Sequence, residues 1–117
     1  MAKNLGVNRR NSIRILIVDD DEKMARLLEL HVNAVAVASC QICHSASDAL
    51  MRLKETSFDL VITDKNMPGM SGLALARRIN QQYPDVILVL LSGYPDLEDL
   101  TNAINDCGIS YFISKPW

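Results

Sequence analysis

The side chains best suited to chemistry in this chain are carboxylates that directly follow short apolar runs. Asp19, Asp20 and Asp21 come after the run IRILIV, and Asp64 comes after the run LVIT. Carboxylates held about 4 Å apart repel by about 4 kcal/mol per pair at an effective dielectric constant near 20. A site that gathers them therefore needs a proton or a cation. A hard divalent ion such as Mg²⁺ suits carboxylate ligands and then accepts phosphate oxygens.

A hydroxyl and an amine extend this set of polar side chains. Ser92 directly follows the run VILVLL, and Lys115 comes two residues after the run YFI. Together with the acids they would form a small receptor for a phosphoryl group, with one carboxylate available as the nucleophile. Zinc would require histidine or cysteine ligands, and neither residue type follows these runs.

A second pattern, CQICH at residues 40–44, has the spacing used for covalent attachment of a c-type haem. Haem is attached in this way outside the cytoplasm, but the first dozen residues lack the apolar core of a signal peptide. Three cysteines, an odd number, also fit a reduced cytosolic chain. We therefore predict no haem, a cytoplasmic location and structural roles for Cys40 and Cys43. A metal or redox role for them is the alternative.

The composition indicates one globular domain. The chain has 117 residues, of which 49% are hydrophobic and 22% charged, and its net charge is -2. This charge gives no basic footprint for direct binding of nucleic acid. No apolar run approaches the length of a membrane span, so we expect no membrane association.

The apolar runs at residues 13–18, 60–63, 86–91 and 111–113 are rich in β-branched residues and do not alternate with polar ones. This pattern is typical of strands buried on both faces of a parallel sheet. Residues 35–43, which carry Cys40 and Cys43, fall where an alternating chain needs its second strand. Helical spacing occurs in four stripes between the runs: Met24, Leu27, Leu28 and His31; Ala46, Ala49, Leu50 and Leu53; Leu75, Ala76, Ile79 and Tyr83; Leu97, Leu100, Ile104 and Cys107.

The alternation predicts an α/β fold, a doubly wound five-stranded parallel sheet with helices on both faces. In the strand order 2-1-3-4-5 the first and third strands are neighbours, so Asp19 or Asp20 would lie beside Asp64. Residues 1–12 are expected to form a flexible arm, and residues 13–117 the domain. Because no fifth helix follows the fifth strand, we expect the natural protein to continue. We also expect an apolar strip that favours self-association.

Four motifs together resemble the signature of the receiver domain of bacterial response regulators in two-component signalling. They are VDDD at 18–21, TDKNMPGMSG at 63–72, LSG at 91–93 and YFISKPW at 111–117. Each alone has an ordinary explanation as a helix cap, a turn or a solvated charge. All four motifs occur in the family's order and at the expected strand ends, which makes the resemblance specific. The resemblance extends over residues 13–117.

The resemblance implies that Asp64 is the phosphoacceptor of a phosphorelay and takes its phosphoryl group from the phosphohistidine of a kinase. Asp19 and Asp20 would hold Mg²⁺ or Mn²⁺ together with Asp64, and Asp20 is the expected direct ligand. Asn66 matches the position whose backbone carbonyl reaches the metal. Asp21 falls outside this metal set, and we expect it in the first turn of the following helix.

The resemblance also assigns a switch. Ser92 would hydrogen-bond the phosphoryl group, Phe112 would change rotamer with it, and Lys115 would contribute positive charge. The bond from Lys115 to Pro116 is cis in such domains. Asn66 and Tyr94 would control access to the phosphoryl group, and the bulk of Tyr94 predicts slow self-dephosphorylation.

The implied partners are a sensor histidine kinase or phosphotransfer protein and a C-terminal effector domain. A homodimer through the surface of the fourth helix and fifth strand is also implied. Such a domain is not an enzyme beyond catalysing its own phosphorylation and dephosphorylation. Two alternatives stay open. One is a non-phosphorylated pseudo-receiver that acts as an interaction module. The other is an aspartyl-phosphate phosphatase, which usually carries a D-x-D pair after its first strand.

Overall fold

The structure, a computed structural model, describes residues 13–35, 37–93, 101, 104–105 and 107–114. Its strands are β1 (Ile13–Val18), β2 (Ala38–Cys43), β3 (Leu60–Asp64), β4 (Ile87–Ser92) and β5 (Tyr111–Ser114). They form one parallel sheet in the order β2-β1-β3-β4-β5, which confirms the predicted α/β fold and strand order. The helices with described bounds are α2 (Glu22–Val35), α3 (Ala46–Glu55) and α4 (Gly72–Gln82).

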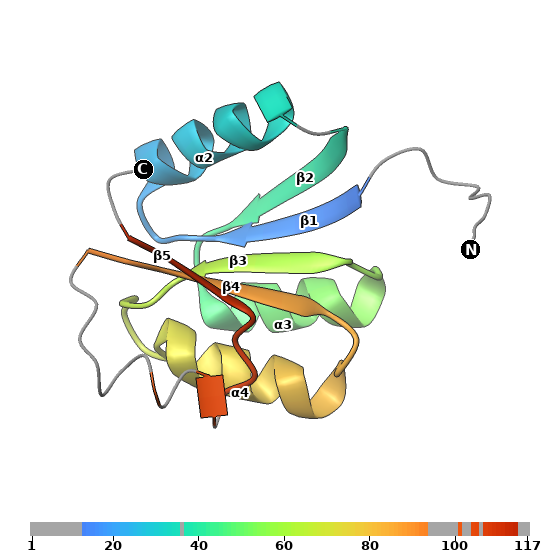
Figure 1. The fold of residues 1–117 in the computed structure, drawn as a ribbon, viewed down its shortest axis with the longest axis vertical. Helices are drawn as coiled ribbons and strands as arrows, with labels where there is room; N and C mark the ends of the chain where they lie inside the picture. The colour runs from blue at the N-terminus through green and yellow to red at the C-terminus, as the bar shows by residue number, and fades with distance from the viewer. Residues whose placement is uncertain (1–12, 36, 94–100, 102–103, 106, 115–117) are drawn as a thin grey trace.

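Helices cover both faces of the sheet, as predicted (Figure 1). Helix α2 lies over one face, where Ala25 and Leu28 pack with alternate residues of the strands. Helices α3 and α4 lie over the other face and enclose the larger apolar cluster, which includes Leu53 and Leu75. Most of the predicted fourth helix, like the predicted arm at residues 1–12, lies outside the described residues.

Strand β1 shows why the apolar runs do not alternate. It pairs with β2 on one side and β3 on the other, and Ile17 lies opposite both Ile42 and Ile62. Because helices cover both faces, Leu16 and Ile17 are fully buried although they point in opposite directions. The described strands β3 and β4 end one residue later than predicted, so Asp64 and Ser92 are the last residues of their strands.

Two sequence predictions about α2 need correction. The helix continues to Val35, so the second strand begins at Ala38 and not at residue 35. Its buried face is formed by Ala25 and Leu28, whereas Leu27 of the predicted stripe is 43% exposed. Helical spacing places Ala25, Leu28 and Val32 on the face that packs against the sheet, so Leu27 lies outside that face.

The last described strand, β5, is less buried than its neighbours. Alternation places Phe112 on the face of α3 and α4, where it packs against the larger cluster. Tyr111 and Ile113 point to the other face and are 63% and 38% exposed. Apolar side chains are therefore exposed here, as the sequence predicts. No helix among the described residues is both long and apolar enough to cross a membrane.

Candidate functional site

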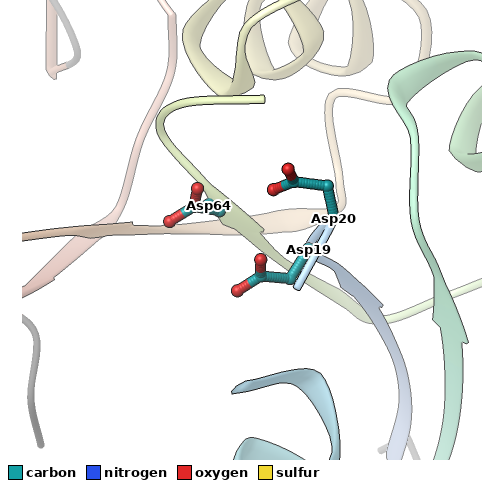
Figure 2. A group of neighbouring side chains, drawn as sticks. All are labelled: Asp19, Asp20 and Asp64. Carbon is teal, nitrogen blue, oxygen red and sulfur yellow. The ribbon is translucent and has the colours of Figure 1, made fainter. Parts of the chain in front are cut away.

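The three predicted acids meet at the carboxyl ends of β1 and β3 (Figure 2). Strands β1 and β3 are paired with Val18 opposite Thr63, so the residues that follow, Asp19 and Asp64, emerge side by side. Each of Asp19, Asp20 and Asp64 offers a carboxylate oxygen, and these oxygens all lie within 4.8 Å of one another. Asp19 and Asp64 are buried and Asp20 is exposed, so the cluster is open to solvent on one side.

Asp19 is held by hydrogen bonds on three sides. Its backbone N–H donates to the carbonyl of Cys43 at 3.1 Å, and its own carbonyl accepts from Nδ1 of His44 at 2.9 Å. Its carboxylate Oδ1 accepts from the backbone N–H of Asp21 at 3.0 Å. A buried carboxylate with this many fixed partners keeps one orientation, so it is a preorganised ligand.

Asp21 stands just before α2 and caps it. Its Oδ1 accepts hydrogen bonds from the backbone N–H groups of Lys23 at 3.0 Å and Met24 at 3.2 Å. This is the bonding pattern of an N-cap residue. The prediction that Asp21 lies within the first turn is therefore wrong by one position, because its side chain satisfies the first turn from outside. The prediction that it stands apart from the acid cluster is consistent with the three residues that gather there.

The loop after β3 brings α4 against the backbone of Asp64. Gly72 begins α4, and its N–H donates to the carbonyl of Lys65 at 2.8 Å. A methyl group added at Gly72 would overlap the backbone carbonyl of Asp64, so only glycine fits there. Lys65 in turn donates its N–H to the carbonyl of Leu91 at 2.8 Å, which ties this loop to β4.

The structure places two of the remaining predicted residues near this edge of the sheet. Ser92 is buried at the end of β4, the strand next to β3, and lies one residue beyond the position opposite Asp64. Asn66 is exposed two residues after Asp64. Phe112 is half-buried on β5 opposite Leu90. Tyr94, Lys115 and the Lys115–Pro116 bond lie outside the described residues, so their predicted roles stay predictions.

The donor set of the acid cluster fits a hard divalent cation. All of its ligand atoms are carboxylate oxygens, which Mg²⁺ and Mn²⁺ prefer, whereas zinc prefers nitrogen or sulfur. Three carboxylates this close repel one another, and a cation would relieve that repulsion. Among the described residues, the Asp20 carboxylate has no hydrogen-bond partner, which leaves its oxygens available to a cation.

The CQICH segment is divided between the two faces of the sheet. Cys43 is buried in the cluster under α3 and α4, while Cys40 packs on the face of α2. All three cysteines are free. Burial raises the pKa of the Cys43 thiol to about 12 and also raises that of Cys40, so both stay protonated at neutral pH. Because the two thiols lie on opposite faces of the sheet, they cannot jointly bind one haem or metal ion, which favours their predicted structural roles.

Sequence reasoning missed two residues that shape the site. His44 was considered only as the end of the CQICH pattern, yet it contacts the backbone of Asp19. Gly72 stood within a quoted motif without a role of its own, yet it sets the approach of α4 to Asp64. Neither contact has a signal in the local sequence, because each joins segments from different strands and helices.

Residues 15–117 match the family described as the response regulator receiver domain. The chain is similar to the C4-dicarboxylate transport transcriptional regulatory protein DctD of Rhizobium meliloti, with 35% identity over 105 residues, covering 88% of this chain and 22% of that protein. It is similar to the hydrogenase transcriptional regulatory protein HoxA of Cupriavidus necator, with 28% identity over 107 residues, covering 88% of this chain and 21% of that protein. It therefore spans about a fifth of the length of these two relatives.

Among solved structures, the chain is similar to the signal receiver domain of an HD domain-containing protein from Pseudomonas fluorescens. The two share 36% sequence identity and a TM-score of 0.84, over 92% of this chain and 85% of that one.

Proposed function

The chain belongs to the response regulator receiver domain family, and from that premise we propose that it is a signalling switch phosphorylated on Asp64. The observation that carries the proposal is the open cluster of Asp19, Asp20 and Asp64 at the ends of paired strands. A phosphoryl donor can approach from the exposed side, where Asp20 faces solvent, while burial and backbone contacts hold the other two acids.

The proposed reaction is transfer of a phosphoryl group to a carboxylate oxygen of Asp64. A bond forms from this oxygen to phosphorus as the bond from phosphorus to the imidazole nitrogen of the donor breaks, and the imidazole leaves with its electron pair. Charge develops on the phosphoryl oxygens during transfer. The Ser92 hydroxyl, at the end of the neighbouring strand, is suited to donate a hydrogen bond to one of them. Lys115 would supply a positive charge.

Asp19, Asp20, Asp64 and the backbone carbonyl of Asn66 are the groups that would hold Mg²⁺ or Mn²⁺. When bound, such a cation neutralises the clustered carboxylates and the incoming phosphoryl oxygens. The protein's own contribution is to fix ligands before the donor arrives. Asp19 is fixed by three hydrogen bonds: its N–H donates to Cys43, its carbonyl accepts from His44, and its carboxylate accepts from the N–H of Asp21.

The signal would leave the site through β4 and β5. Phosphorylation adds negative charge and hydrogen-bond acceptors beside Ser92. Movement of Ser92 would be followed by Phe112, which packs at the edge of the larger apolar cluster. The surface altered in this way is formed by β5 and the helix predicted at residues 97–107. We assign to it the contact with an effector domain or with a second copy of the chain.

The proposed partners are a histidine kinase or phosphotransfer protein as donor and a C-terminal effector as the responder. Two relatives that the chain matches over only about a fifth of their length are transcriptional regulatory proteins. The receiver itself would bind neither nucleic acid nor a membrane, and would catalyse only its own phosphorylation and dephosphorylation. Three free cysteines support a cytoplasmic location.

The test is to incubate the protein with Mg²⁺ and acetyl phosphate and to measure its intact mass. The wild type should gain one phosphoryl group, and Asp64→Asn should gain none. Asp21→Asn is the matched control, because it also removes one negative charge while asparagine still caps α2. This control should be labelled like the wild type. A folded wild-type protein that gains no mass would refute the proposal and favour a pseudo-receiver.

A further inference from the structure

His44, at the end of β2, contacts residues on both sides of Asp20. It is the first residue after β2, and its two ring nitrogens have different partners. Nδ1 lies 2.9 Å from the backbone carbonyl oxygen of Asp19, and Nε2 lies 2.9 Å from the carboxylate Oε1 of Glu22. One side chain therefore contacts the residue before Asp20 and the first residue of α2.

These contacts complete a set of anchors around a short segment. The backbone N–H of Asp19 is already bound to Cys43, so the bond from His44 fixes the other side of the same residue. Glu22 also forms an exposed ion pair with Arg26, whose Nε lies 3.0 Å from the other carboxylate oxygen of Glu22. Asp20 lies between these anchors and has none of its own among the described residues.

We propose that His44 is a positioning residue that holds the Asp20 carboxylate in place for the divalent cation. The inference rests on the proposed function, because it takes Asp20 as a cation ligand. His44 does not touch the cluster's carboxylates. It restrains the backbone on both sides of the exposed acid, and this lowers the freedom that Asp20 would lose when a cation binds.

The bond to Asp19 should matter more than the contact with Glu22. The side chains of His44 and Glu22 are 46% and 59% exposed, and exposed ion pairs contribute little because water screens them. The Asp19 carbonyl, in contrast, belongs to a buried residue that is itself part of the cluster. A variant that keeps only the Nδ1 bond should therefore keep most of the effect.

The test compares three variants by Mn²⁺ titration of the unphosphorylated protein at one fixed pH, followed by the paramagnetic resonance signal of free Mn²⁺. His44→Ala removes both contacts and should weaken Mn²⁺ binding about tenfold, the lower end of losses for residues that orient metal ligands. In His44→Asn the amide nitrogen occupies the place of Nδ1, so binding should stay within about threefold of the wild type. His31→Ala is the matched control, because His31 makes the same ring-to-carbonyl contact within α2, at 2.9 Å from Leu27. Its affinity should be unchanged.

A second readout separates positioning from a general loss of structure. Urea unfolding of the cation-free proteins should give similar free energies for His44→Ala and His31→Ala, although only the first loses affinity. Wild-type affinity in His44→Ala would overturn the inference, as would equal losses in His44→Ala and His31→Ala. Tighter Mn²⁺ binding in both His44 variants would also overturn the inference, because His44 would then affect the cation through its charge and not through its contacts. If the wild type binds no Mn²⁺, the cation site of the proposed function fails as well.

Discussion

The two ends of the sheet differ in what they offer a ligand. At the carboxyl ends of β1 and β3, three acids gather with their carboxylate oxygens within 4.8 Å of one another. At the amino ends of β3 and β4 lies a surface cavity of about 310 Å³, lined in part by Leu53, Phe58 and Tyr83. The cavity and the acid cluster thus lie at opposite ends of the sheet. The proposed chemistry rests on the charged groups that converge at the strand ends and not on this cavity.

The physical cause of this difference is the direction of the strands. In a parallel sheet every strand ends at the same edge, and the following helices begin there, with their positive dipole ends near the incoming anion. Helices α3 and α4 end at the opposite edge, and their last buried apolar residues, Leu53 and Ile79, belong to the larger apolar cluster. The carboxyl edge therefore gathers polar groups, whereas these helix ends contribute to the core.

The largest expected change in cation affinity is at the carboxyl end and concerns Asp20. Asp20→Asn removes the exposed ligand, so Mn²⁺ affinity should fall by at least about tenfold, with a matching loss of labelling rate at limiting cation. Thermal stability without cation should not fall, because one of three mutually repelling charges is gone. Calorimetric titration and a melting curve of the same sample measure both. If Asp20→Asn instead lowered the melting temperature and left the Mn²⁺ affinity unchanged, Asp20 would serve the stability of the fold and not cation binding.

The next effect belongs to the amino end. Phe58 is buried beside the cavity, so Phe58→Ala should lower the free energy of unfolding by about 3–5 kcal/mol. Phe58→Leu, which keeps most of the volume, should lose far less. Both variants should still be labelled on Asp64 with one phosphoryl group under folding conditions. Urea unfolding and intact mass measure the two properties, and loss of labelling in a folded Phe58→Leu protein would show that the ends are coupled.

Much of the difference between the two ends of the sheet could be predicted from the sequence, because the ends of the strands can be recognised in it. The alternation of apolar runs and helical stripes predicted a parallel sheet, and the known strand order of such folds then brought together the acids that follow the first and third runs. The starting point of β2 was not predicted, because alternating alanine and valine at residues 34–38 fit a helix as well as a strand. The contacts of His44 and Gly72 could not be predicted, because they depend on how separate segments approach.

Gly72 lies where the packing of a helix meets the site, so it should affect both stability and chemistry. In Gly72→Ala the added methyl group overlaps the backbone carbonyl of Asp64. We expect α4 to shift and the free energy of unfolding to fall by about 1–3 kcal/mol. The labelling rate should fall as well. Ala74→Gly, an exposed position in the same helix, is the control, and it should lower stability by about 1 kcal/mol without slowing labelling. If Gly72→Ala and Ala74→Gly were labelled at equal rates, Gly72 would affect stability alone and would have no role in the site.

The smallest expected effect tests whether the carboxyl end contains any thiol chemistry. Burial raises the pKa of Cys43 from its ordinary value of 9.0 to about 12. The unfolded thiol therefore loses its proton near pH 9, whereas the folded one keeps it until about pH 12. The stability that this thiol contributes is complete below pH 9 and is lost as pH rises towards 12. Urea unfolding at pH 8 and pH 10 should show the advantage of the wild type over Cys43→Ala narrowing by about 1 kcal/mol. An advantage that widens with pH would instead indicate a stabilised thiolate beneath α3, where Arg52 is the charged neighbour that lowers the pKa of Cys43.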